Sequence, residues 1–177
     1  TTSLGELDFS KDGRYLAYST SVGGSDWRTI VVKDVQTGMM LDDKVEWVKF
    51  SGIAWQGNGF YYTHFPVPKK GDELKAANKL GAVYYHELGT LQSTDKLVFN
   101  DKAHPDRSFG GATTDDERFL YVSGWESTSG NALFFKDLSK KTDGFVTLIN
   151  TYEKDFGVVD NIGDKLLILT NKNAPNQ

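Results

Sequence analysis

The sequence predicts an all-β fold: a β-propeller fragment of about three and a half four-stranded antiparallel blades. The first observation is a strand-forming string that starts at Arg14 and returns at Phe60, Arg118 and Lys165, as GRYLAY, GFYYTH, ERFLYV and DKLLIL. The second is that further short apolar segments accompany these strings in a constant order. Four short strands in a period of ~40 to 50 residues are typical of one propeller blade.

The first repeat shows how its strands are delimited. Ser10–Gly13 combines short polar side chains with a glycine that can adopt positive φ, which predicts a turn. Two strand-forming runs follow, separated by the polar loop Ser19–Asp26, and together they predict a hairpin. The four strands expected in this repeat lie at 4–9, 14–18, 29–35 and 45–48.

The same order of segments continues to the end of the sequence. The blades are expected at approximately 4–48, 50–101 and 109–150, with an incomplete blade at 156–177. No linker or low-complexity segment divides the chain, so residues 1–177 are interpreted as one partial domain. Because a closed propeller usually needs four to eight blades, we expect this chain to be part of a larger ring. The alternative is a complete small protein with an irregular end.

The second repeat departs from the others at His64–Gly81, which adds about a dozen residues between two strands. Loops longer than the fold requires are often functional, and a tolerated surface insertion is the alternative. The polar residues of this loop include His64, Lys69, Lys70, Asp72 and Lys79.

Composition excludes several classes of function. The net charge is −4 and the basic residues are scattered, so the electrostatic footprint of a nucleic-acid-binding protein is missing. No apolar run approaches the length needed to span a membrane, and no membrane partner is expected. With no cysteine there is no thiolate nucleophile, disulfide or cysteine-based zinc site.

The three histidines, His64, His86 and His104, show no spacing typical of metal ligands, so neither a metal nor another cofactor is expected. His86 occupies the place that Lys33 and Lys136 take in other repeats, which predicts an exposed strand residue. His104 precedes a proline in a polar loop. Nothing in the pattern makes any of the three a catalytic base.

No serine lies in a sequence pattern typical of a catalytic nucleophile. The segment Gly23–Trp27 begins like the G-x-S-x-G elbow, but tryptophan replaces the last glycine and the expected hairpin leaves no helix after Ser25. The carboxylates of Asp42-Asp43 and Asp115–Glu117 are expected in turns, where they serve solvation and capping. The chain by itself is therefore predicted to be catalytically silent.

Several ordered motifs resemble the propeller domain of the prolyl oligopeptidase family. They are GSDW ending at Trp27, VKFS with AW at 48–55, YYH with LGT at 84–90, and GGA with DD-x-R at 110–118. The segment Thr170–Asn176 is similar to a further stretch of that propeller. The resemblance covers essentially all 177 residues.

The resemblance implies a two-part serine peptidase that cleaves short peptides after proline. A seven-bladed propeller would cover the active site, and the Ser-Asp-His triad would lie in an α/β-hydrolase domain that this chain does not contain. The implied partners are short proline-containing peptides and the hydrolase domain of the same parent chain.

The resemblance also implies site residues. Phe50 and Phe109 match positions that line an apolar subsite, and the repeats place both at the start of the first strand of a blade. The alternative for each is a core position between blades. Asp26 matches an acidic residue that shapes the charge facing the catalytic domain. Its family partner is an arginine, but this chain has Trp125-Glu126 at that place.

Two further roles follow from the same motifs. Trp27 is expected to anchor packing rather than to contact substrate, because a large ring gains most from burial. The insertion His64–Gly81 matches a family loop near the domain interface that gates entry, and the resemblance therefore makes its polar residues candidates for a gate: His64, Lys69, Lys70, Asp72 and Lys79.

Other functions remain open at the level of sequence. One alternative is a non-catalytic propeller used as an interaction module, and another is the propeller of a dipeptidyl or acylaminoacyl peptidase. Terminal blades should leave apolar faces and strand edges uncovered, so we expect the isolated chain to self-associate. The compartment would be periplasmic for a bacterial source and cytoplasmic for a eukaryotic one.

Overall fold

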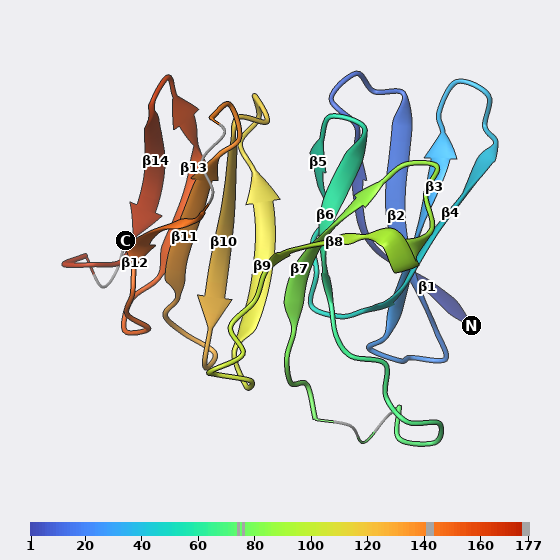
Figure 1. Cartoon of the computed structure of the whole chain (residues 1–177), viewed down its shortest axis with the longest axis horizontal. Coiled ribbons are helices and arrows are strands. Elements are labelled where there is room, and N and C mark those ends of the chain that lie inside the picture. The colour runs from blue at the N-terminus through green and yellow to red at the C-terminus, as the bar shows by residue number, and fades with distance from the viewer. Residues whose placement is uncertain (74, 76, 141–143, 175–177) are drawn as a thin grey trace.

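The computed structural model describes residues 1–73, 75, 77–140 and 144–174. The paired strands in these ranges are all antiparallel, which confirms the predicted all-β propeller class (Figure 1). No helix in the described ranges is long and apolar enough to cross a membrane. The strands are β1 (Thr2–Phe9), β2 (Tyr15–Val22), β3 (Arg28–Asp34), β4 (Met40–Val48), β5 (Ala54–Gln56), β6 (Gly59–His64), β7 (Ala82–Glu87), β8 (Lys96–Phe99), β9 (Ser108–Thr113), β10 (Phe119–Trp125), β11 (Ala132–Asp137), β12 (Val146–Ile149), β13 (Phe156–Ile162) and β14 (Lys165–Thr170), with a 3-10 turn at Gln92–Thr94.

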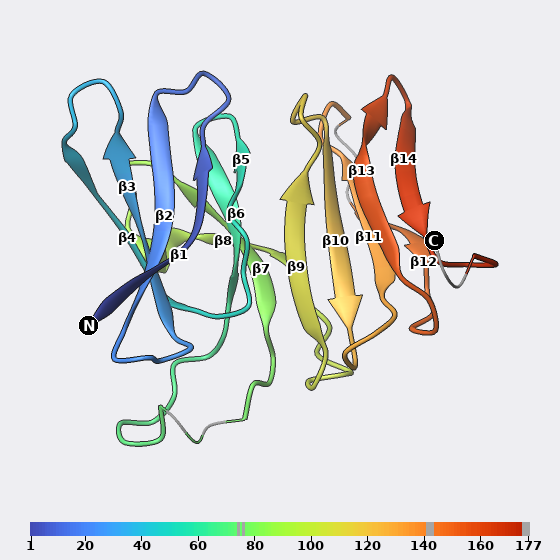
Figure 2. The ribbon, with the colours of Figure 1, turned by 180° about the vertical axis from the view of Figure 1, so that it is seen from behind.

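Consecutive strands pair with one another to form the blades. β1 to β4 make the first blade, β5 to β8 the second, β9 to β12 the third, and β13 and β14 pair as a hairpin. One pair, Val48 with His64, joins β4 of the first blade to β6 of the second. The blades stand side by side in both views (Figures 1 and 2).

A repeated hydrogen-bond pattern defines the turn that enters the second strand of a blade. In the first blade Ser10 Oγ accepts from the Tyr15 N–H, and Asp12 accepts from the Arg14 N–H. Thr114 and Asp116 make the same bonds to Phe119 and Arg118 in the third blade. Each turn thus folds through its own short polar side chains, as the sequence indicates.

The core lies between neighbouring blades rather than within one. Phe60 and Tyr62 of β6 pack toward the first blade, while Tyr61, between them in sequence, packs toward the third. A strand that is covered on both faces favours apolar residues at successive positions, which explains the run GFYY, and the buried Thr63 that follows donates its hydroxyl to the Phe109 carbonyl. Two apolar surfaces remain open: Leu4, Leu7 and Phe9 on β1, and Val159, Ile162, Leu167 and Leu169 on β13 and β14.

His86 is not the exposed strand residue that the sequence predicted. Its ring is fully buried on β7, with Nδ1 2.8 Å from Asp95 and Nε2 3.1 Å from Asp43. Asp43 is likewise not in a turn, because it lies buried in β4 of the first blade. The prediction failed because a strand pattern does not reveal which carboxylates of a neighbouring blade face the ring.

The surroundings of His86 favour its protonated form. Burial by itself lowers the pKa of the ring, but the hydrogen bonds and charges of Asp95 and then Asp43 outweigh burial and raise this pKa. Asp95 also accepts a hydrogen bond from the Tyr62 hydroxyl at 2.6 Å. The His86 ring therefore links the second blade to the first through Asp43, while Asp95 holds the ring from within its own blade.

Replacing His86 with leucine should lower the free energy of unfolding by roughly 3 to 5 kcal/mol, because two buried carboxylates lose their cation. Since the folded pKa is raised, this stabilisation should be complete below about pH 6.5 and should decline as pH rises through the folded pKa. Urea unfolding from about pH 6 to about pH 9 measures the difference between the two proteins. His104→Leu, at an exposed ring, is the control; a difference independent of pH would contradict the protonated state.

Candidate functional site

The loops that carry the candidate residues lie at one end of the blades. These are the β2–β3 loop with Asp26, the β4–β5 link with Phe50, the β6–β7 insertion, the β8–β9 link and the β10–β11 loop with Glu126. They are at the lower end of the molecule in Figure 1. Because each blade repeats the same strand directions, equivalent loops must emerge at the same end. One face of the propeller therefore gathers segments that are distant in sequence.

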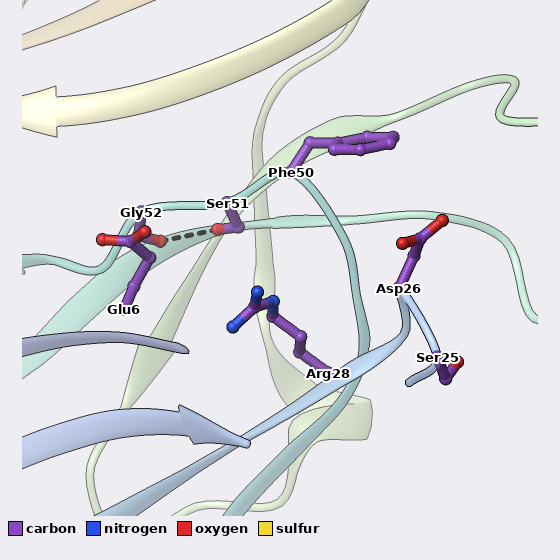
Figure 3. Close-up of a pocket in the computed structure, with 7 residues that line it drawn as sticks. All are labelled: Glu6, Ser25, Asp26, Arg28, Phe50, Ser51 and Gly52. Atoms are coloured by element: carbon purple, nitrogen blue, oxygen red, sulfur yellow. Dashed lines mark hydrogen bonds between the residues drawn. The ribbon is translucent and has the colours of Figure 1, made fainter. Parts of the chain in front are cut away.

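A pocket of about 470 Å³ opens on this face near the junction of the first two blades. Its lining residues are Glu6, Ser25, Asp26, Arg28, Phe50, Ser51 and Gly52 (Figure 3). They come from β1, the β2–β3 loop, β3 and the β4–β5 link. The GSDW and VKFS motifs, which the sequence separates, thus meet at one cavity.

Phe50 stands at the edge of this pocket on an unusual backbone. It has φ of 50° and precedes β5, so the first strand of the second blade begins at Ala54 rather than at Phe50 as predicted. The side chain is 59% exposed and contacts Phe65 edge-on, at 6.4 Å between ring centroids. A left-handed backbone is unfavourable for phenylalanine and persists only where surrounding contacts impose it. The ring is therefore not buried at the junction of the first two blades.

Phe109 has a different environment. It lies within β9, is 2% exposed, and packs against Phe99 with 5.1 Å between ring centroids. A Cβ on Gly124 would meet its ring, so glycine provides the space that the ring fills. Phe50 and Phe109 therefore do not occupy equivalent points. The packing of Phe109 favours the core interpretation.

Asp26 pairs with a cation that the sequence analysis missed. Its carboxylate lies 3.4 Å from Lys49 Nζ, and the Lys49 side chain is only 10% exposed while that of Asp26 is 72% exposed. The same ammonium group lies 5.0 Å from the centre of the Trp27 ring. Because an ammonium group is attracted by both a carboxylate and an aromatic face, these contacts join the VKFS motif, which contains Lys49, to the GSDW motif. Lysine directly precedes Phe50 in the VKFS motif, and this position was the feature of the sequence that could have identified Lys49 as the partner of Asp26.

Trp27 packs as an anchor for the insertion. Its indole N–H donates to the Glu73 carbonyl at 2.7 Å, and its ring contacts Trp47 and Phe65 edge-on. Further along, the Leu80 N–H donates to the Pro105 carbonyl at 2.7 Å. The insertion is thus attached at its beginning, middle and end. The predicted gate residues lie on it, with Lys69, Lys70, Asp72 and Lys79 exposed and His64 half-buried at the end of β6.

Glu126 takes part in an ion pair of its own. Arg107 donates to its carboxylate from Nε at 2.8 Å and from Nη2 at 2.6 Å, and also donates to Asp101 at 2.8 Å. Arg107 stacks on Tyr152 as well. The positive charge at this loop therefore comes from the β8–β9 link, a segment that the sequence analysis did not single out. His104 contacts Asp101 in the same cluster.

The described residues contain no cluster of three or more histidine, cysteine, aspartate or glutamate side chains that could hold a metal ion. What the face offers instead is a pocket that combines an exposed aromatic ring, two carboxylates and a guanidinium. Such a mixture suits a peptide, which presents both apolar side chains and polar backbone groups.

Comparison with known proteins shows the family. A family model described as "Prolyl oligopeptidase, N-terminal beta-propeller domain" matches residues 1–177, so the chain belongs to this propeller family of prolyl oligopeptidases. A prolyl endopeptidase of Elizabethkingia miricola is 45% identical over 177 residues, which cover 99% of this chain and 25% of that protein. Prolyl oligopeptidase A of Amanita bisporigera is 33% identical over 99% of this chain and 26% of its own length.

Solved structures agree with this assignment. One from a study of two prolyl endopeptidases superposes with a TM-score of 0.90 at 35% identity, covering 98% of this chain and 25% of that one. Prolyl oligopeptidase B from Galerina marginata, bound to a 35mer hydrolysis and macrocyclization substrate, has a TM-score of 0.88 at 30% identity, covering 98% of this chain and 26% of that one. The chain spans about a quarter of the length of these relatives.

Replacing Trp27 with phenylalanine should loosen the insertion while keeping most of the aromatic packing. The loss of one hydrogen bond to Glu73 should speed tryptic cleavage at the exposed Lys69 and Lys70 by roughly 3- to 10-fold. Limited proteolysis followed by mass spectrometry measures the rate. Trp125→Phe, at a tryptophan outside these contacts, is the control. An unchanged cleavage rate in the Trp27 variant would show that the indole does not hold the loop.

Proposed function

We propose that this propeller is part of a serine endopeptidase that cleaves short peptides after proline, and that its loop-bearing face adjoins the catalytic domain. The observation that carries the proposal is the family match over residues 1–177, together with the meeting of the GSDW and VKFS segments at one pocket. Relatives that share this propeller are named prolyl endopeptidases. The hydrolase domain of the same parent chain would carry out the cleavage.

The pocket residues have distinct roles in this proposal. Phe50 offers an exposed apolar ring to a peptide side chain. Asp26, which pairs with Lys49, places a carboxylate in the same pocket. Phe109 supports the face from the core, since its ring is enclosed. The insertion His64–Gly81 lines the same end of the molecule, and its tethering to Trp27 supports a role in limiting which peptides enter.

A peptide with a blocked amino terminus, an internal proline and a chromogenic leaving group tests the proposal. A longer protein that carries this propeller together with a hydrolase domain should cleave it after proline, whereas the chain of residues 1–177 should not. Failure of the longer protein to cleave would favour a non-catalytic module, or a dipeptidyl peptidase, which needs a free amino terminus. Cleavage by the chain itself would mean that it contains its own nucleophile, and Ser25 with His64 or His104 would be the first residues to replace.

In the longer protein, Phe50→Ala should raise KM for this peptide by roughly 10-fold or more, because burying an aromatic side chain contributes about 1.5 to 3 kcal/mol. Met39→Ala is the matched control, since Met39 is also exposed but lies in the β3–β4 turn at the opposite end of the blade. Equal KM values for the native protein and the Phe50 variant would show that Phe50 does not contact the bound peptide.

We also propose that the isolated chain self-associates through its uncovered blade faces. Leu4 on β1 and Leu169 on β14 are 61% and 58% exposed among other apolar side chains. The double variant Leu4→Lys with Leu169→Lys should therefore shift the mass measured by light scattering toward the monomer at micromolar concentration. Leu91→Lys, at an exposed leucine away from both faces, should not. A sharp monomer mass for the native chain would contradict self-association.

A further inference from the structure

A second cavity lies at the end of the blades that is opposite the loop-bearing face. It has a volume of about 660 Å³ and is lined by residues of both the first and the second blade. The first blade supplies Tyr15 at the start of β2 and residues 39–43 of the β3–β4 turn and β4. The second supplies Asn58 in the β5–β6 turn and residues 88–91 after β7. The β3–β4 and β5–β6 turns are at the upper end of the molecule in Figure 1. A volume of this size is typical of small-molecule sites.

Most of the side chains that line this cavity are apolar. Tyr15, Leu41 and Leu88 are half-buried and pack against the core cluster between the first two blades, so they form its inner side. Met40 and Leu91 line it as well and are 47% and 74% exposed. Apolar side chains that gather around one exposed cavity are typical of a surface that a ligand covers.

The loop between β7 and β8, which carries Leu91, is fixed against the first blade. Before Leu91, the Gly89 N–H donates to the Asp43 carboxylate at 2.6 Å. After it, the Gln92 side chain accepts from the Glu46 N–H and donates to the Glu46 carbonyl, both at 2.9 Å. Because the loop is held on both sides of Leu91, this side chain stays exposed and the cavity is preformed.

A buried carboxylate contributes to the inner side of the cavity. The Asp43 side chain lines it and is 3% exposed. Asp43 Oδ1 accepts from His86 Nε2 at 3.1 Å and from the Gly89 N–H at 2.6 Å, whereas Oδ2 accepts no hydrogen bond from the residues that the structure describes. Oδ2 is not enclosed either, because among these residues Arg28 Nη1 is the one enclosed side-chain nitrogen or oxygen without a partner. Since buried carboxylate oxygens usually have donors, a donor from a ligand would complete the site.

The charge of the cavity is negative. Asp42 and Asp43 both line it, and none of the described residues that line it is a lysine or an arginine. The single charge of His86 is shared between Asp43 and a second carboxylate. Arg14, next to the lining residue Tyr15, is already paired with Asp34 at 3.5 Å. Such a cavity attracts a cation and repels an anion.

We propose that this cavity binds a small organic cation, whose ammonium group donates a hydrogen bond to Asp43 Oδ2 and whose hydrocarbon body packs against Met40 and Leu91. A bare metal ion does not suit the lining, because it needs several oxygen ligands and most of these side chains are apolar. The bound cation contacts two blades at the end remote from the proposed peptide site. The inference therefore does not depend on the proposed peptidase function.

Isothermal titration calorimetry with hexylammonium tests this site in the longer protein that carries this propeller together with a hydrolase domain. Hexylammonium should bind about 10-fold or more tightly than hexanol, the usual effect of a charge-assisted hydrogen bond. Hexanoate, which has the same hydrocarbon body and the opposite charge, should bind more weakly than hexanol.

Two variants and a matched control locate the binding. Asp43→Asn removes the carboxylate charge and should weaken hexylammonium binding about 10-fold or more. Leu91→Lys places a competing ammonium group at the rim and should weaken binding by a similar factor; because Leu91 is exposed, this variant serves if Asp43→Asn does not fold. Leu97→Lys makes the same substitution at an exposed leucine of the same blade that lines a different pocket, and it should leave binding unchanged.

Three results would overturn the inference. Equal affinity for hexylammonium and hexanol would show that the carboxylate does not take part. Hexylammonium binding that Leu91→Lys leaves unchanged, or that Leu97→Lys weakens equally, would place the cation elsewhere on the protein. No binding of hexylammonium at millimolar concentration would show that the cavity does not hold this class of ligand.

Discussion

The packing of one blade against the next is the constraint on which the rest of this structure depends. A four-stranded sheet has two faces, and a single blade cannot bury either of them by itself. The second blade shows the result, because Phe60 and Tyr62 on one face and Tyr61 on the other belong to different core clusters. Stability therefore resides in the junctions between blades, and the outermost faces stay apolar and uncovered.

The junction between the first two blades combines this core with polar groups at its two ends. His86 joins the second blade to the first through Asp43 on one side of the apolar cluster, and Arg28 lines a cavity on the other. Buried charges that are paired hold a structure in one arrangement. The same junction thus serves both stability and the proposed recognition of peptides.

The loops at one end depend on that framework. Trp27 holds the insertion through Glu73, and Lys49 connects Trp27 to Asp26 and to the link that carries Phe50. These contacts join segments from different blades, so the face keeps its shape only while the blades remain packed. A peptidase that admits peptides through such a face would couple access to the integrity of the propeller.

The sequence alone determined the strand repeats, the turns and the family, because these depend on local patterns. Ser10–Gly13 encodes its turn through its own side chains, and the GSDW and VKFS motifs can be recognised without any contact. Only the tertiary structure decided that His86 is buried between two carboxylates, that Phe50 is exposed while Phe109 is enclosed, and that Arg28 lies over Gly5. Each of these depends on which residues of one blade or strand face another, and strand periodicity carries no information about such long-range neighbours.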